Sequence, residues 1–431
     1  MSHTIQNFDA LAQNELRTDA LEIAEAGYAA INVGLALAHK LSIEDDKLHV
    51  GGTIHRLAGR RIFFVGVGKC AITAAATIER IFGDRLVGGI ALDVSMPEGI
   101  HLAKIEACVG THPLPSETNR DTTQRIVDLL SSCRQDDFVI MLISGGGSTL
   151  LCLPEAPMTV DDERALFSGL TARGASIQEI NTIRKHTSLA RGGWLAQAAY
   201  PAGVVSLIVS DVPGNDMGFI ASGPTVLDTS TIEDVRSILV RYQITPPETV
   251  SFIETPKDPQ YFERMTNILF LTNRDALVAM QDEAKRRGYA VIIADDCFTG
   301  EARAVAARVQ GDLRAAQPRT VLLYAGESTV TLPTDVGGVG GRNQEISLIA
   351  LNAIQDSELI LPFASDGRDD TDHAGAIADT LTRAHAADKN LSIEKALSTF
   401  SSYDFFSTAG DALITGYTGS NVSDLIIAMK H

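Results

Sequence analysis

Short apolar runs rich in β-branched residues recur along most of this chain, and each is followed by turn residues and a helical segment. In the first half these runs span residues 62–67, 87–94, 105–110, 138–143 and 204–209, and in the second half residues 268–271, 291–294, 321–324, 360–364 and 412–415. A helix that follows a strand carries the chain back across the sheet, so strands that alternate with helices pair mainly in parallel. The spacing predicts an α/β protein with largely parallel or mixed sheets covered on both faces.

The alternation breaks between residues 243 and 260, where the periodicity is lost and four prolines gather. A chain of 431 residues has room for two or three domains at roughly 150 residues each, and a single break favours two. We expect an N-terminal α/β domain over residues 1–245 and a C-terminal one over residues 260–431. The first fifty residues read as helix, and these helices could pack on the second domain.

Composition excludes several classes of protein. The chain has 36 Lys and Arg against 54 Asp and Glu, a net charge of −18, and 45% hydrophobic residues. It can therefore bury a sizeable core, and as a whole it would repel nucleic acid and anionic membranes, although local groups could still bind a small anion. The five cysteines form no CxxC pair, and no signal-like or membrane-spanning run is present. We expect a cytoplasmic protein with reduced thiols.

Polar residues follow several of the predicted strands, where open α/β sheets bind their ligands. The run Gly66-Val67-Gly68-Lys69-Cys70-Ala71 joins one strand to a helix, and its glycines would let the backbone approach an anion. It is no Walker loop, because Phe63 stands where the first glycine should be. It does match GxGxxA with Asp93 downstream, which keeps a dinucleotide site open beside a plain strand-to-helix turn.

Two further glycine runs favour an anion site. Ser144-Gly145-Gly146-Gly147-Ser148 follows an apolar strand, and its amides and flanking hydroxyls could surround a phosphate. Gly337-Gly338-Val339-Gly340-Gly341 leads into Arg342, Asn343 and Glu345 at a helix start, and an arginine fork suits a carboxylate or a phosphate. A flexible surface loop is the alternative in both places.

Charged residues supply the other candidates. Arg184 and Lys185 belong to a basic cluster in an acidic chain, which is either a solvated helix face or a means of concentrating anions. Asp211, Glu327 and Asp366 follow strands, and oxygen ligands of this kind suit Mg²⁺ shared with substrate phosphates. His112 is more typical of a structural histidine.

Nine motifs, in order from about Leu16 to the C-terminus, resemble the class II glycerate kinases, whose C-terminal half is the MOFRL domain. They are GVGKCA, THPLPSETN, LISGGGSTLL, INTIRKHTSLARGGWLA, SDVPGNDMGFIASGPTVLDTST, AGESTV, GGRNQEISL, SDGRDDTDHAGA and TGYTGSNVSDL. The chain departs from the family pattern at Asn215, Asp370 and Tyr417, where Asp, Gly and Pro are expected.

The resemblance implies two dissimilar three-layer α/β domains, the N-terminal one Rossmann-like, with the active site in the cleft between them. It also implies ATP-dependent phosphorylation of D-glycerate, at the 2-hydroxyl, with Mg²⁺. Lys69, Asp211 and Arg342 match the family's catalytic residues.

From these matches we expect the following site. The phosphates would lie against Gly66, Gly68 and the run from Ser144 to Ser148, with Mg²⁺ held by Asp366 or Glu327. The glycerate would meet Arg184, Lys185, Asn343 and His112. Asp211 would accept the hydroxyl proton, and a monomer or homodimer is expected. Two alternatives remain: a nicotinamide-dependent hydroxypyruvate reductase and a non-catalytic sensor of a sugar acid or nucleotide.

Overall fold

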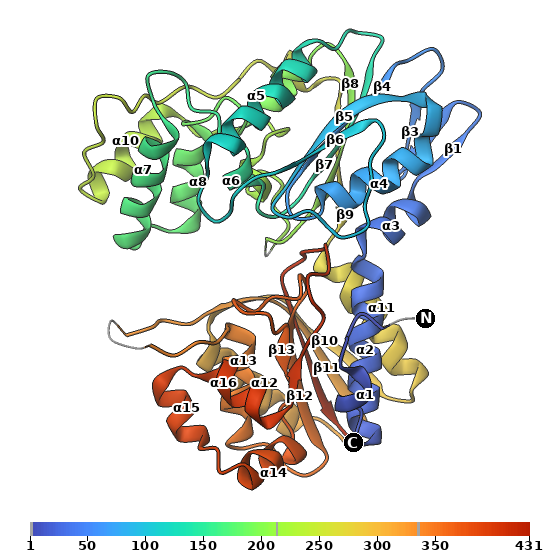
Figure 1. Cartoon of the computed structure of the whole chain (residues 1–431), viewed down its shortest axis with the longest axis vertical. Coiled ribbons are helices and arrows are strands. Elements are labelled where there is room, and N and C mark those ends of the chain that lie inside the picture. Colours follow the sequence, from blue (N-terminus) through green and yellow to red (C-terminus); the bar gives the residue numbers. More distant parts are fainter. Residues whose placement is uncertain (1–2, 213, 334–336) are drawn as a thin grey trace. The chain divides into compact units, whose positions relative to one another are not determined.

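The computed structural model of the chain describes residues 3–212, 214–333 and 337–431. It divides into two compact units (Figure 1). The central unit comprises Val33–Asp211 and Asn215–Phe270, and the terminal unit comprises Met1–Asn32, Val212–Gly214 and Leu271–His431. The sequence placed the boundary between residues 245 and 260, whereas here the main crossing lies at residues 270–271 and the first 32 residues join the terminal unit.

The central unit is built on a six-stranded sheet with the order β6-β5-β4-β7-β8-β9. The strands β6, β5, β4, β7 and β8 pair in parallel. This is the Rossmann order, in which the chain starts in the middle of the sheet and reverses direction between β4 and β7, and the expectation of a Rossmann-like N-terminal domain is confirmed. The strands span Ile62–Val67 (β4), Leu86–Asp93 (β5), Ile105–Val109 (β6), Phe138–Ile143 (β7), Gly203–Val209 (β8) and Met265–Leu271 (β9).

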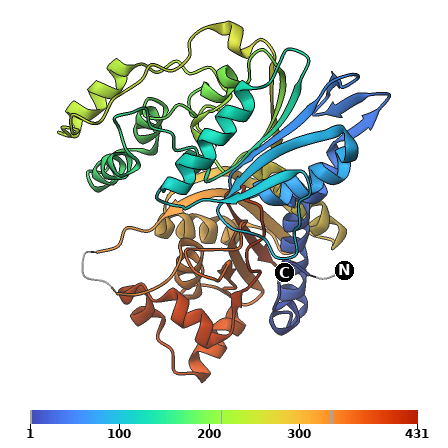
Figure 2. The ribbon, with the colours of Figure 1, turned by 45° about the horizontal axis from the view of Figure 1, so that its top comes forward.

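Helices cover this sheet, and every residue of β4, β7 and β8 is buried. A small antiparallel sheet of Ser42–Glu44 (β1), Lys47–Val50 (β2) and Thr53–Arg56 (β3) projects from the central unit in both views (Figure 2). The helices are Val33–Lys40 (α3), Ala71–Phe82 (α4), Glu117–Ser131 (α5), Gly147–Leu150 (α6), Val160–Ala172 (α7), Ile177–Lys185 (α8), Trp194–Ala199 (α9) and Ile232–Arg241 (α10), with 3₁₀ turns at Gly83–Arg85 (η1), Ile220–Ser222 (η2) and Pro259–Phe262 (η3).

The terminal unit holds a mixed six-stranded sheet with the order β10-β11-β15-β12-β13-β14. Only β10 and β11 pair in parallel, and the later neighbours are antiparallel. The strands span Ala290–Glu301 (β10), Thr320–Thr329 (β11), Glu358–Ala364 (β12), Gly375–Ala376 (β13), Ala412–Leu413 (β14) and Asp424–Lys430 (β15). The last strand was not predicted, and the strand expected at 268–271 belongs to the central sheet as β9.

An N-terminal helix, Glu15–Ile31 (α2), packs along Asn273–Arg286 (α11) in this unit (Figure 1). Gly27 allows the close approach, because a Cβ there would lie 2.8 Å from Sδ of Met280. The guanidinium of Arg17 is fully buried and donates to the carboxylates of Asp379 and Asp411, at 2.7 Å in each case. The remaining helices are Phe8–Leu11 (α1), Ala302–Ala315 (α12), Arg342–Leu351 (α13), Thr380–Asp388 (α14), Ile393–Thr399 (α15) and Ser402–Ala409 (α16).

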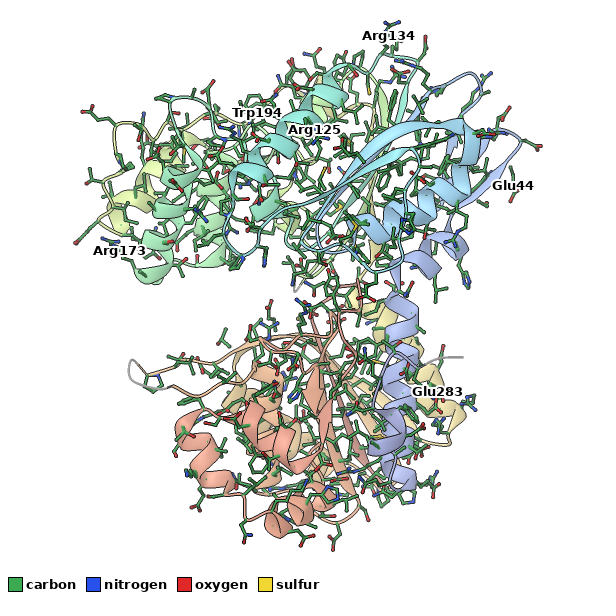
Figure 3. The ribbon with its side chains drawn as sticks, viewed as in Figure 1. Glu44, Arg125, Arg134, Arg173, Trp194 and Glu283 are labelled. Carbon is green, nitrogen blue, oxygen red and sulfur yellow. The ribbon has the colours of Figure 1, made fainter. Side chains whose placement is uncertain are left out.

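Charged side chains such as Glu44, Arg134 and Arg173 lie at the periphery of the central unit (Figure 3). Among the described residues, no single helix is both long and apolar enough to cross a membrane; α2 and α3 reach that length only as a bent pair.

Candidate active site

Two of the predicted loops meet at the point where the central sheet reverses direction. The loop from Gly66 to Lys69 follows β4, and the loop from Ser144 to Ser148 follows the neighbouring strand β7. The amide of Lys69 donates to the carbonyl of Gly145 (2.9 Å), and the amide of Ser144 donates to the carbonyl of Val67 (2.9 Å). Open α/β sheets bind their ligands in the crevice at the carboxyl ends of the strands, at the point where the strand order reverses.

Glycine is required on both sides of this contact. Gly68 has φ +118°, and a Cβ there would lie 2.1 Å from Oγ of Ser144. Gly146 has φ +83°, and a Cβ there would lie 3.3 Å from Cγ of Lys69 and 3.6 Å from Cδ2 of His112. The structure therefore brings Lys69, His112 and the glycine run together, as the sequence predicted.

The amides of this loop divide into two groups. The amide of Gly147 donates to the carbonyl of Ser144 (3.2 Å). Within the described part of the chain, the amides of Gly145, Gly146 and Ser148 form no backbone hydrogen bond. The Ser144 hydroxyl donates to the carbonyl of Val67 (3.4 Å). The Ser144 hydroxyl is thus engaged by a carbonyl in this geometry, whereas the amides are available as anion donors, and the expected contact of this hydroxyl with a ligand stays a prediction.

Asp211 follows the next strand, β8, and its charge acts on the same turn. Burial raises the pKa of the Cys70 thiol to about 12, and the carboxylates of Asp93 and Asp211 add to the shift. Cys70 lies directly after Lys69, so the carboxylate of Asp211 is in electrostatic range of the β4–α4 turn.

Asp93, the acidic residue of the dinucleotide alternative, has a structural role. Its Oδ2 accepts from the amide of Ile72 in the first turn of α4 (3.0 Å), and its Oδ1 accepts from the amide of Val94 (2.7 Å). Its exposed fraction is 1%, and burial raises its pKa to about 6. A carboxylate engaged in this way caps the helix, and both of its oxygens are already used by backbone amides.

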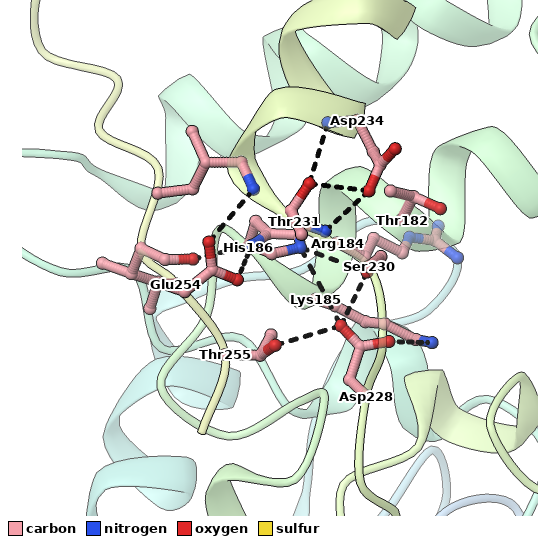
Figure 4. Close-up of polar contacts among 12 residues, drawn as sticks. Thr182, Arg184, Lys185, His186, Asp228, Ser230, Thr231, Asp234, Glu254 and Thr255 are labelled. Atoms are coloured by element: carbon pink, nitrogen blue, oxygen red, sulfur yellow. Dashed lines mark hydrogen bonds and ion pairs between the residues drawn. The ribbon is translucent and has the colours of Figure 1, made fainter. Parts of the chain in front are cut away.

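The basic cluster at the end of α8 is largely neutralised (Figure 4). Nζ of Lys185 lies 2.9 Å from Oδ1 of Asp228, and the Arg191 guanidinium lies 2.7 Å from Glu163. Burial works against the charge of Asp228, but the hydrogen bond from Ser230 and the charge of Lys185 hold its pKa below the ordinary value. Both cations are therefore engaged in ion pairs within the central unit.

Arg184 differs from its neighbours. Its guanidinium lies over the ring of Phe167, 5.1 Å from the centroid, and no carboxylate pairs with it among the described residues. Burial and the charge of Arg191 together lower the pKa of Arg184 to about 10, against the opposing charge of Glu163. A half-buried cation without an acidic partner favours an anionic ligand.

In the terminal unit, Arg342 begins α13 and pairs with two carboxylates. Its Nε donates to Oδ2 of Asp424 (2.5 Å), and its NH1 lies 2.6 Å from Oε1 of Glu327. Burial opposes the charge of Arg342, yet these two carboxylates raise its pKa. Sequence reasoning missed Asp424, although the TGYTGSNVSDL motif contains it.

Sheet register explains this meeting. Asp424 starts the antiparallel strand β15, opposite Gly326 on β11 and Ala364 on β12. The ends of those strands carry Glu327 and Asp366, so the two predicted metal ligands share one sheet edge with Arg342. The exposed fraction of Asp366 is 8%, and its Oδ1 accepts from the amide of Arg368 (3.0 Å).

Asn343 and the second glycine run make close contacts within the terminal unit. The amide and Nδ2 of Asn343 both donate to Oδ1 of Asp369, at 3.0 and 3.1 Å, so Asp369 caps α13. A Cβ on Gly341 would lie 2.0 Å from the Asp369 carbonyl, and one on Gly340 would lie 2.0 Å from Oγ of Ser402. These glycines permit close packing, and the expectation that the run surrounds an anion is not supported by this geometry.

The side chains at this edge offer oxygen donors of the kind that a hard cation prefers, although among the described residues they form no tight three-ligand group. Asp366, Glu327 and Asp424 offer carboxylate oxygens, and the buried Oδ1 of Asn343 has no hydrogen-bond partner within the part of the chain described. Burial raises the pKa of Asp424 to about 6, and a divalent cation would favour its charged form. In the described ranges, a tight three-ligand group forms only at Asp295, Asp296 and Cys297, where Arg274 and Arg308 already pair with the carboxylates.

A cavity of about 290 Å³ lies beside Arg342. It is lined in part by Val330, Phe400 and Ser402. Ser328 and Glu345 also line it, but the unpartnered Oγ and Oε1 of these two residues are sealed from solvent and cannot reach a ligand without movement.

Known proteins match both halves of the chain. Residues 19–254 match a family described as a domain of unknown function, DUF4147, and residues 320–424 match the MOFRL family. A glycerate 2-kinase of Pyrococcus horikoshii is 34% identical over an alignment of 438 positions. The alignment covers 95% of this chain and 98% of the relative. A protein of Agrobacterium vitis, provisionally named a hydroxypyruvate reductase, is 36% identical. The alignment covers 88% of this chain and 90% of that relative.

A crystal structure of a glycerate kinase from Thermotoga maritima has a TM-score of 0.83 and 30% identity. The match covers 96% of this chain and 99% of that structure. The motifs, the Rossmann strand order and these relatives agree, and the chain belongs to the class II glycerate kinase family.

Proposed function

We propose that this protein transfers the γ-phosphoryl group of ATP to the 2-hydroxyl of D-glycerate, giving 2-phosphoglycerate and ADP. The observation that carries the proposal is the meeting of Lys69 with the Gly145–Ser148 loop at the switch point of a Rossmann sheet, in a chain whose relatives include a glycerate 2-kinase. Phosphoryl transfer depends mainly on positioning and on neutralising charge, and this arrangement offers both.

In the central unit, the amides of Gly145, Gly146 and Ser148 would bind phosphate oxygens. Lys69 would neutralise the transferring group, since its side chain lies against Gly146. Asp211 would accept the proton of the attacking hydroxyl. Arg184 would pair with the glycerate carboxylate, because the other cations of its cluster already have carboxylate partners.

In the terminal unit, Arg342 shares its charge with Glu327 and Asp424, so the group carries one more negative charge than positive. Such a group repels a lone carboxylate and attracts a divalent cation. Glu327, Asp366 and Asp424 would therefore hold Mg²⁺, which supplies the positive charge that phosphoryl transfer needs. Arg342 would then hold the two carboxylates in place between turnovers.

A second function, reduction of hydroxypyruvate with a nicotinamide cofactor, is suggested by the name of the Agrobacterium relative and by GxGxxA. The role of Asp93 as a helix cap counts against it, because a dinucleotide site uses that carboxylate for the ribose.

One assay separates the two. Purified protein with ATP, Mg²⁺ and D-glycerate should release ADP and form 2-phosphoglycerate, while hydroxypyruvate with NADH should give no oxidation. ADP release that does not depend on glycerate, or NADH oxidation, would contradict the proposal. Product analysis by NMR distinguishes 2- from 3-phosphoglycerate.

Two variants test the assigned roles. Lys69→Ala should lower kcat by about a hundredfold or more with the unfolding midpoint unchanged, and near-normal turnover would remove it from the reaction. Asp211→Asn should lower kcat by a similar factor, whereas a change confined to KM would show that it is not the base.

A further inference from the structure

Residues 221–223 form a left-handed turn that packs against the Gly145–Ser148 loop. Ala221 has φ +51° and ψ +25°, Ser222 has φ +61°, and Gly223 has φ +58°. The left-handed region costs a non-glycine residue about 1–2 kcal/mol. Two such residues in succession persist only where the surroundings fix the backbone, and strain of this kind concentrates at functional sites.

Buried hydrogen bonds hold the turn. The Ser222 hydroxyl lies 2.6 Å from Oδ1 of Asn181, whose Nδ2 donates to the carbonyl of Phe219 (3.1 Å). The amides of Gly192 and Gly193 donate to the carbonyls of residues 222 and 223, at 2.8 and 2.9 Å. Ser222 is fully buried, and the exposed fraction of Asn181 is 4%.

The turn touches the loop at two atoms. A Cβ on Gly147 would lie 2.6 Å from Cβ of Ala221, so the methyl group of Ala221 occupies the space that a side chain at 147 would need. Oγ of Ser222 lies 2.9 Å from Oγ of Ser148. The Ser222 hydroxyl is oriented to donate to Oγ of Ser148 and to Oδ1 of Asn181, so it joins the loop to the buried amide of Asn181.

We propose that Asn181 and Ser222, with Ala221, are positioning residues that hold the Gly145–Ser148 loop in its anion-binding geometry. They touch no substrate. The inference rests on the proposed function, because it takes the loop to be the site of the nucleotide phosphates. The same strained turn places the Ser222 hydroxyl against Ser148 and the Ala221 methyl group against Gly147.

Two variants and a matched control test this in the full-length protein. Ser222→Ala removes the hydroxyl, and Ala221→Gly removes the methyl group and relieves the left-handed strain. Gln243→Gly is the control, since Gln243 has φ +53° in the same unit but is exposed at the end of α10. The measurements are the dissociation constant of ADP with Mg²⁺, by titration calorimetry, and the KM values for ATP and D-glycerate.

Both turn variants should weaken ADP binding and raise KM for ATP by about tenfold, leaving KM for D-glycerate within twofold. Gln243→Gly should change none of these values. Wild-type ADP affinity in both variants, or an equal effect of the control, would overturn the inference. A wild-type protein that binds ADP without phosphorylating glycerate would sink the proposed function alone, and one that binds no ADP would overturn both.

Discussion

Replacing Arg342 by methionine should destabilise the protein by an amount that grows with pH. Methionine keeps much of the side-chain length and removes the charge. In the wild-type protein, burial raises the pKa of Asp424 to about 6 even beside the guanidinium, and the exposed fraction of its side chain is 2%. Without Arg342 this pKa rises further, because burial and the charge of Glu327 then act unopposed.

The magnitude follows from linkage between protonation and folding. In the folded wild-type protein and in the folded variant, the pKa of Asp424 exceeds the ordinary aspartate value of 3.8. The stability that this shift contributes is therefore present at low pH and lost as pH rises. The contribution of Asp424 to wild-type stability stops falling near pH 6, whereas in the variant it continues to fall by about 1.4 kcal/mol per pH unit. The difference is near zero at pH 5 and reaches about 2.7 kcal/mol at pH 8. Loss of the half-exposed Glu327 pair adds about 0.2–1 kcal/mol at every pH.

The measurement is urea unfolding at pH 5 and pH 8 in EDTA, which keeps divalent cations away from the carboxylates. Far-ultraviolet circular dichroism is the probe, because the single tryptophan, Trp194, lies in the central unit. Arg286→Met is the control, since Arg286 pairs with Glu283 on α11 and its side chain is 67% exposed. Equal destabilisation by Arg342→Met at the two pH values would refute the reasoning.

Three further outcomes follow from the same structure. Gly68→Ala should abolish most turnover, because its Cβ would lie 2.1 Å from Oγ of Ser144. Gly59→Ala is the control, since Gly59 has φ +72° and open space around it, so this variant shows only the cost of a left-handed backbone at a non-glycine residue. The measurements are kcat and the unfolding midpoint of both variants. Arg17→Met should lower the free energy of unfolding by about 3–5 kcal/mol at pH 7, measured in urea, because it removes the guanidinium that pairs with the two buried carboxylates of Asp379 and Asp411. Arg184→Leu should raise KM for D-glycerate at least tenfold with little change in KM for ATP, and an unchanged value would remove it from the substrate site.

Local pattern was enough to predict most buried strands, because each is a continuous apolar run between turns. It was not enough to order them. β15 inserts antiparallel between β11 and β12, and its pairing depends on contacts 60 to 110 positions apart in the chain. Domain membership of the N-terminal helices, which the sequence left open, depends on contacts of the same kind: Arg17 is joined to the terminal unit by partners 362 and 394 residues away.

In the candidate site, too, local pattern predicted some features, and long-range contacts decided the others. The rule that ligands bind after strands identified the loops at Lys69 and Ser144, because that rule needs only the order of elements along the chain. It could not show that Ser222 forms a hydrogen bond with the Ser148 hydroxyl, since the two residues are 74 positions apart in the chain. A glycine run likewise looks the same in sequence whether it admits a phosphate or, as at Gly341, a neighbouring carbonyl.

Charge pairing decides which cations remain for an anionic substrate. In a chain of net charge −18, Lys185, Arg191 and Arg342 each lie within 3 Å of a carboxylate, so their fields are largely cancelled at a distance. Arg184 has no such partner among the described residues, and the loop amides carry no counter-charge. An acidic kinase can thus bind two anions without a basic surface, provided that its anion donors are backbone amides, one unpaired guanidinium and a metal ion held by carboxylates.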